Sequence, residues 1–197
     1  SAEQLQLTVV DTSEKPVADA VVVIRGDGLA PLPATGPALI TQHDKTFRPL
    51  VTVIRIGTAV EFPNEDDIMH HVYSFSKPKK FDIPLYKDKK PEPVIFEQPG
   101  VVTLGCNIHD WMKAFIYVTD APVFGKTSET GTLAFTVPVG TCAIDVWHPR
   151  LKKVQGDPLP RQVTIIRGAP SDLRIVLELK KSSTPSRAPT LDTGGSY

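Results

Sequence analysis

Three side chains that could bind a soft metal ion stand at three-residue intervals in the stretch LGCNIHDWMKAFIYV, residues 104–118. Cys106 offers a thiolate, His109 an imidazole and Met112 a thioether. Cysteine or methionine alone is usually a packing residue, but the three together suit a tight loop that closes over one ion. Zinc gains little from a thioether, whereas copper accepts all three donor types. The spacing therefore predicts a copper site that still lacks one donor.

A fourth donor is available upstream, in FPNEDDIMHHVYSFS, residues 62–76. His70 and His71 stand directly before an expected strand, and neighbouring strand residues point to opposite faces. We therefore expect only one of them to face the interior, and the pattern alone does not select it. Two imidazoles, a thiolate and a weak thioether form the ligand set of a blue copper centre. The acidic residues 65–67 are interpreted as a solvated turn, with a carboxylate ligand as the less favoured alternative.

The elements that must position these donors are expected to be strands. Apolar and polar residues alternate in residues 4–10, 132–137 and 172–180, as they do in half-buried strands. No segment shows the pattern of an amphipathic helix. With 19 prolines and 13 glycines distributed between many short runs, the sequence predicts an all-β protein built from sandwiches.

Composition narrows the classes of function. Lys plus Arg and Asp plus Glu number 22 each, so no basic field would gather nucleic acid. No apolar stretch approaches the roughly 20 residues of a membrane helix, and we expect no membrane insertion. The start at Ser-Ala-Glu suits a mature periplasmic or otherwise extracytoplasmic chain after signal peptide removal, or a shortened chain. No nucleophile with a paired base, no carboxylate dyad and no phosphate loop is visible, so we expect no enzyme.

The middle of the chain resembles a known family. The segments FRPLVTVIRIGTAVEFPNEDDIMHHVYSF and EQPGVVTLGCNIHDWMKAFIYV are similar to the cupredoxins, the plastocyanin and amicyanin type of blue copper protein. The nearest variant looks like the cupredoxin-like proteins that are often labelled methylamine utilisation proteins. The resemblance implies a Greek-key sandwich with one mononuclear copper ion, held by the ligands His70, Cys106, His109 and Met112. His70 is chosen over His71 because the first ligand of the family usually stands two residues before the strand valine, here Val72.

The motif departs from the family pattern at two places. Many cupredoxins carry asparagine directly after the first histidine, where it ties the two ligand loops together, and this chain carries His71. His71 could replace that hydrogen bond, be the true ligand, or bind elsewhere. Asp110 and Trp111 lie between the expected ligands of the second loop, and Asn64 belongs to the first loop, so these residues are candidates for contacts around the ligands or for alternative ligands.

The two flanks resemble another sandwich. QLQLTVVDTSEKPVADAVVVIR and KTSETGTLAFTVPVGTCAIDVWH are similar to the beginning and the later part of a carboxypeptidase-regulatory-like sandwich. Because the N-terminal strands need partners, we expect one small sandwich that is split by the copper module. The predicted segments are N-terminal strands 1–27, connector 28–41, cupredoxin domain 42–119, remainder of the split sandwich 120–180 and disordered tail 181–197.

Other residues receive structural interpretations. Cys142 shares a strand face with apolar residues and is predicted to be a buried thiol rather than a second ligand or a disulfide partner. His148 is predicted to be a hydrogen-bonded histidine at a strand end, and His43 is given no role. The lysine-rich residues 77–90 are interpreted as a solvated loop that could also guide an acidic redox partner.

The resemblance implies a type 1 copper protein that carries single electrons between redox protein partners. In this family the second histidine, here His109, reaches through an apolar surface patch, to which Trp111 and Phe115 would contribute. Two alternatives stay open. The chain could bind copper as cargo for delivery in the periplasm, or it could be a non-redox sandwich adaptor with a vestigial copper module.

Overall fold

The structure is a computed structural model that describes residues 1–152 and 159–182. Most of the segment predicted to be a disordered tail, residues 183–197, lies outside the described residues. The described residues contain strands and no helix, and therefore no helix long and apolar enough to cross a membrane. The strands are, in chain order, β1 (Ala2–Asp11), β2 (Val21–Gly26), β3 (Ala38–Leu39), β4 (Thr41–His43), β5 (Thr46–Arg48), β6 (Val51–Arg55), β7 (Thr58–Glu61), β8 (His70–Ser74), β9 (Phe81–Tyr86), β10 (Val94–Phe96), β11 (Gly100–Gly105), β12 (Lys113–Thr119), β13 (Val123–Lys126), β14 (Thr132–Pro138), β15 (Gly140–Trp147), β16 (Arg161–Ile165) and β17 (Ser171–Leu177).

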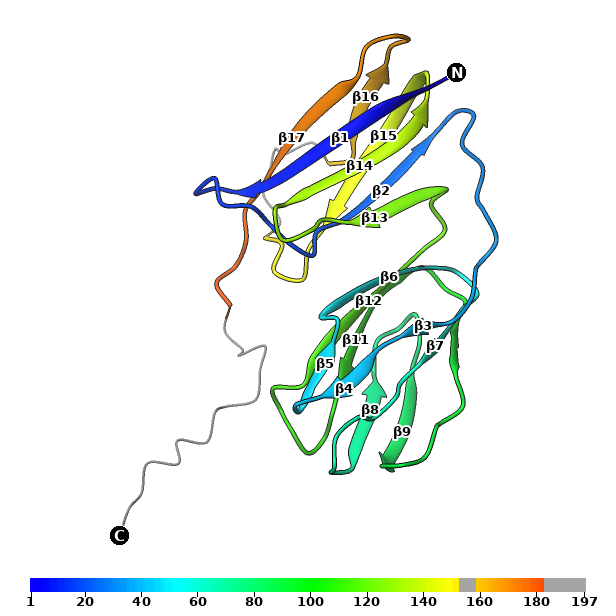
Figure 1. Ribbon diagram of the computed structural model, residues 1–197, viewed down its shortest axis with the longest axis vertical. Helices are drawn as coiled ribbons and strands as arrows, with labels where there is room; N and C mark the ends of the chain where they lie inside the picture. Colours follow the sequence, from blue (N-terminus) through cyan, green and yellow to red (C-terminus); the bar gives the residue numbers. More distant parts are fainter. Residues whose placement is uncertain (153–158, 183–197) are drawn as a thin grey trace.

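The first sandwich is formed by the middle of the chain, in the lower half of Figure 1. Its larger sheet has the strand order β6-β12-β11-β8-β9, in which β6 and β12 are parallel and the other neighbours are antiparallel. A smaller sheet, β10-β7-β3, faces it across a shared apolar core. That core is made by Val60 and Phe96 from the small sheet and by Leu104 and Ile116 from the large one, all fully buried.

The second sandwich joins the two ends of the chain, in the upper half of Figure 1. One sheet has the order β14-β1-β17 and the other has the order β13-β2-β15-β16. The central strand β1 is antiparallel to β14 and parallel to β17, and Leu7 is in register with Leu133 on one side and Leu173 on the other. This confirms the predicted fold class, which is all-β with a second small sandwich built from the N- and C-terminal flanks. The exact limits of the five segments, and the carboxypeptidase-regulatory-like character of the flanks, stay predictions.

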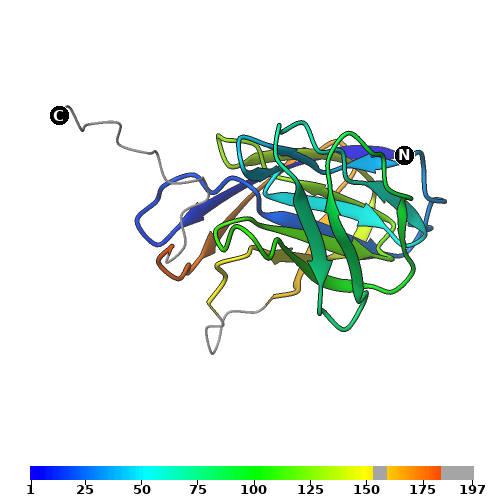
Figure 2. The same ribbon diagram turned by 90° about the horizontal axis from the view of Figure 1, so that it is seen from below.

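An apolar seam holds the two sandwiches together, and they overlap end-on in Figure 2. Val21 and Ala121 are fully buried there beside Val51 of the first sandwich. The Trp147 ring of the second sandwich lies 5.5 Å from Tyr117 and 6.0 Å from Phe115, centroid to centroid. Burial of aromatic and branched apolar side chains supplies most of the free energy that holds two such sandwiches together.

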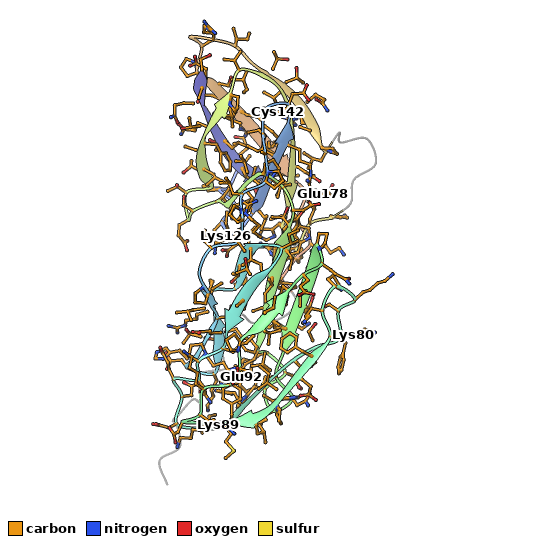
Figure 3. All side chains as sticks on the ribbon, turned by 90° about the vertical axis from the view of Figure 1, so that its right-hand side faces the viewer. Lys80, Lys89, Glu92, Lys126, Cys142 and Glu178 are labelled. Atoms are coloured by element: carbon orange, nitrogen blue, oxygen red, sulfur yellow. The ribbon has the colours of Figure 1, made fainter. Side chains whose placement is uncertain are left out.

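The interpretations of two residues in the second sandwich are confirmed. Cys142 is 5% exposed within the apolar core, and burial raises the pKa of its thiol. His148 is buried at the end of β15, where its Nε2 lies 3.1 Å from the Ala18 carbonyl oxygen and its Nδ1 accepts the Arg150 N–H at 3.1 Å. Burial lowers the pKa of His148, with a smaller contribution from Arg150. Figure 3 shows Cys142 in the second sandwich, with Lys126 close to the seam.

Candidate metal centre

Two loops at one end of the first sandwich carry the predicted donors. One loop follows β7 and ends at His70, the first residue of β8, and the other connects β11 to β12 and carries residues 106–112. Strands β8 and β11 are neighbours, with Gly105 opposite Tyr73. A Cβ atom at Gly105 would lie only 2.7 Å from the Tyr73 ring, so glycine allows this ring to pack against the strand just before Cys106. Sheet pairing therefore brings the two loops together.

Three of the predicted donors converge. One donor atom from each of His70, Cys106 and His109 lies within 4.8 Å of the others. The Cys106 Sγ atom is 4.0 Å from His109 Nδ1, and the two imidazole rings are 5.1 Å apart with an angle of 63° between their planes. The exposed fractions are 0% for His70, 3% for Cys106 and 9% for His109. The group is therefore almost closed to solvent, with His109 nearest to the surface.

The two ring nitrogens of His70 have different surroundings. Its Nε2 lies 2.7 Å from the Asp66 Oδ2 atom, and because a carboxylate oxygen can only accept a hydrogen bond, Nε2 carries the proton and donates it in this bond. That bond places the unprotonated lone pair on Nδ1, which is buried and has no hydrogen-bond partner within the described residues. A buried polar atom without a partner is costly, and a metal ion bound at Nδ1 would remove that cost. A histidine oriented by a carboxylate is also the usual arrangement of a metal ligand.

Asp66 holds this arrangement in place. Besides His70, its two oxygens accept the backbone N–H groups of Asp44 and Lys45, each at 2.8 Å. Burial alone would raise the pKa of Asp66, but the hydrogen bonds from His70, Lys45 and Asp44 lower it overall. The side chain is only 12% exposed, so the interpretation of this residue as part of a solvated turn is wrong. Its neighbours Glu65 and Asp67 are exposed, as predicted.

His71 points away from the converging group. Its Nε2 forms a hydrogen bond with Asp82 on β9, and its ring lies 5.3 Å from Tyr73. The register of β8 against β9 shifts between His70 and Val72. The adjacent histidines thus occupy opposite sides of the strand, and His70 is the one beside Cys106 and His109.

The remaining candidates lie around the group with distinct contacts. Met112 is 1% exposed and belongs to the core of the first sandwich, and its N–H donates to the His109 carbonyl at 3.0 Å. Asp110 is exposed and lines, with Cys106 and Met112, a cavity of about 450 Å³. The Trp111 ring is 4.9 Å from that of His109, and its Nε1–H donates to the Lys45 carbonyl at 2.8 Å. Burial lowers the pKa of His109, and the nearby His70 and Lys45 lower it further.

Asn64 shapes the first loop rather than linking the two. Its amide donates to the Ile68 and Tyr86 carbonyls at 2.9 and 2.8 Å, and its oxygen accepts the Asp66 N–H at 2.9 Å. These bonds fix the backbone that presents Asp66 to His70. The sequence placed Asn64 among residues around the ligands but did not indicate this role.

Sequence reasoning missed a buried polar pair in the first sandwich. The Tyr86 hydroxyl donates to the Phe62 carbonyl at 2.6 Å and accepts from the Gln42 amide at 2.8 Å. Both side chains are buried, and burial raises the pKa of Tyr86. Because Gln42 stands just before the turn at Asp44 and Lys45, these bonds anchor the segment that supplies the two N–H donors to Asp66.

A second group of possible ligands, His43, Asp44 and Asp66, also comes within 4.8 Å. His43 is 42% exposed and lies 3.4 Å from Asp44 and 3.5 Å from Glu65, and Asp44 also pairs with Arg48 at 3.3 Å. The Nδ1 atom of His43 has no hydrogen-bond partner within the described residues, but this cluster is largely exposed and contains no sulfur donor. We therefore assign no metal to it.

The sequence matches no known family model and no curated protein. Solved structures with a similar fold include a variant of amicyanin in its reduced Cu(I) form, which is 16% identical, with 50% of this chain and 98% of that chain aligned at a TM-score of 0.40. A copper-containing nitrite reductase from Thermus scotoductus SA-01 is 28% identical over 57% of this chain and 28% of that chain, at a TM-score of 0.40. A purple cupredoxin from Nitrosopumilus maritimus is 24% identical over 42% of this chain and 99% of that chain, at a TM-score of 0.33. At these TM-scores the structural similarity does not indicate a function. The function is therefore inferred from the side chains of the candidate metal centre.

Proposed function

We propose that this chain is a mononuclear type 1 copper protein that carries single electrons, with His70, Cys106, His109 and Met112 as its ligands. The observation that supports it most is that His70, whose side chain lies beside Cys106 and His109, has a buried Nδ1 atom without a hydrogen-bond partner within the described residues. The opposite nitrogen of the same ring is fixed by Asp66 at 2.7 Å. Thiolate and imidazole are donors that suit copper, and a thioether is a weak further ligand that favours copper over zinc.

Bound copper would supply one-electron oxidation and reduction at this position. The role of the chain is to hold the donors in one arrangement. His70 begins a strand, Cys106 and Met112 directly adjoin strand ends, and Asp66 fixes the His70 ring. A site that is fixed in this way changes little between redox states, which favours fast transfer. His109, with the Trp111 ring against it, lies nearest to the surface and is the natural point of entry for an electron.

The proposal includes a cellular role that follows from this chemistry. We infer that the protein exchanges electrons with a redox protein partner in the periplasm or another extracytoplasmic compartment, and that it catalyses no reaction of its own.

Copper titration tests the central part of the proposal. Cu(II) added to the full chain should bind with one equivalent per chain and produce an intense visible band together with the electron paramagnetic resonance signature of a thiolate-bound copper.

The adjacent histidines allow a matched test of the ligand assignment. His70→Ala should abolish or bleach the visible band, because it removes the buried imidazole that lies beside Cys106 and His109. His71→Ala removes a side chain that bonds with Asp82 instead, so it should leave the band in place and only shift the reduction potential. Both variants are measured by Cu(II) titration under identical conditions, and the reverse pattern would assign the ligand to His71.

Asp66 is expected to control copper affinity without touching the metal. Asp66→Ala removes the acceptor of His70 and of two backbone N–H groups, and loss of such a partner typically costs about 10- to 100-fold in metal affinity. Competition with a copper chelator measures the change. Asp67→Ala is the matched control, because Asp67 is the exposed neighbouring carboxylate, and it should bind copper as the unaltered chain does. Equal losses of copper affinity in both variants would mean that removal of any nearby negative charge causes the effect, and would contradict the specific role of Asp66.

A further inference from the structure

A groove of about 540 Å³ lies beside the seam of the two sandwiches, and we call it the inter-sandwich groove. Trp111, Lys113 and Phe115 line it from the first sandwich. His148, Arg150 and Lys180 are among the residues that line it from the second. It therefore exists only because the second sandwich packs beside the copper module.

The charges of the groove are unbalanced. Four cationic side chains line it, and none of them forms an ion pair within residues 1–152 and 159–182: Lys113, Arg150, Lys180 and Lys181. Of its two carboxylates, Asp19 is paired with Lys126 at 3.3 Å. Asp11 accepts the N–H groups of Ser13 and Lys15 at 2.8 and 3.0 Å. The groove thus offers positive charge that no carboxylate of the described residues pairs with, although the whole chain has a formal net charge of zero.

Apolar groups lie between these charges. Leu50, Trp111 and Phe115 of the first sandwich and Val17 and Leu179 of the second line the same groove. A small inorganic anion would use the charges but not this apolar surface. An acidic segment of a protein matches both, because it carries carboxylates beside apolar side chains.

The groove also reaches the candidate metal centre. Trp111 lines it and has its ring 4.9 Å from that of His109, and the Trp111 Nε1–H is held by the Lys45 carbonyl at 2.8 Å. An occupant of the groove would therefore contact the residue that packs against the most exposed of the proposed histidine ligands.

We propose that the inter-sandwich groove docks an acidic, partly apolar segment of a partner protein. The identification of this partner as the electron-transfer partner rests on the proposed function, whereas docking itself does not. Docking in the groove would assign a binding role to the second sandwich, because its residues Arg150, Lys180 and Lys181 supply three of the four unpaired cations. The lysine-rich segment of residues 77–90 is a competing position for an acidic partner, although it is not the loop that the sequence predicted, because its residues 81–86 form β9.

A binding experiment separates the two positions. The probe is a fluorescein-labelled decapeptide of alternating glutamate and leucine, titrated with the full chain and followed by fluorescence anisotropy, with and without Cu(II). The double variant Lys180→Glu with Lys181→Glu changes two exposed groove residues. The double variant Lys80→Glu with Lys89→Glu makes the same change of charge at exposed lysines of the first sandwich, which Figure 3 labels.

We expect the groove variant to weaken peptide binding by about tenfold or more at low salt, and the control variant by less than about twofold. Equal weakening in both variants, or a greater loss in the control, would overturn the proposal. So would an oligonucleotide of equal charge that binds as tightly as the peptide. Peptide binding without added copper separates failure of the groove from failure of the copper assignment.

The unaltered chain provides a second readout. Its two tryptophans are Trp111 and Trp147, so its nuclear magnetic resonance spectrum should contain two indole N–H signals. The peptide should shift the Trp111 signal more than the Trp147 signal, because Trp111 lines the groove and Trp147 contacts it only through Phe115. A peptide that binds without shifting the Trp111 signal occupies another surface and contradicts the proposal.

Discussion

Replacing Cys106 with serine is expected to abolish the intense visible band of the Cu(II) protein while both sandwiches stay folded. A thiolate is a soft ligand whose charge transfer to Cu(II) gives the colour, and a serine hydroxyl cannot replace it. Cys106 lies in the loop between β11 and β12, outside the strand ladders, and the change keeps nearly the same volume. The band is measured at equal copper loading, with circular dichroism to verify the fold.

Cys142→Ser is the matched control, because the chain contains only these two cysteines and both are free and buried. Cys142 belongs to the core of the second sandwich, so its replacement should leave the band unchanged. A band that survives in Cys106→Ser, or disappears in Cys142→Ser, would contradict the assignment of the thiolate ligand.

The strands could be predicted from the sequence because their signal is local. In residues 4–10 the alternation places Leu5, Leu7 and Val9 on one face, and all three are fully buried. The partners of this strand could not be predicted in the same way. Strand β1 is parallel to β17, with Leu7 opposite Leu173, and no local pattern encodes a pairing between the two ends of the chain. Only the need of an isolated strand pair for partners suggested it.

The candidate site also has one part that the sequence indicates and one part that it does not. Cys106, His109 and Met112 were recognised because one short loop carries all three. Asp66 was not, because it is one of three adjacent acidic residues and its function depends on a separate turn. That turn presents the N–H groups of Asp44 and Lys45, whose φ angles are 49° and 55°.

The contribution of the second sandwich to the groove could not be predicted from the sequence. Lys113 directly follows the loop of residues 106–112, whereas Lys180 and Lys181 come near the end of the described residues. Nothing in their sequence positions indicates that they line one groove with Trp111. A charge pattern along the chain therefore could not predict a docking surface, and the lysine-rich residues 77–90 were the more visible candidate.

Copper binding is expected to stabilise the folded chain strongly in both oxidation states. The fold itself fixes the proposed donors, because Asp66 orients the His70 ring and Cys106 and Met112 directly adjoin strand ends. A ligand that binds only the folded state adds RT ln(1 + [L]/Kd) to the free energy of unfolding, about 4 kcal/mol when free metal is a thousand times the Kd. For a chain of 197 residues, this corresponds to an increase in the melting temperature of roughly 8–16 °C.

Comparison of the two oxidation states separates an electron carrier from a copper delivery protein. Cys106 and Met112 suit Cu(I), while His70 and His109 suit both states, so a carrier should show similar increases in melting temperature with Cu(I) and with Cu(II). The measurement is thermal unfolding in the presence of a modest chelator, together with repeated one-electron cycling and a count of the copper retained. The Cys106→Ser variant is the control and should lose most of the gain with Cu(I), because its thiolate is absent. Release of copper at every change of oxidation state would instead identify the metal as cargo, since a delivery site needs to hold only one of the two states.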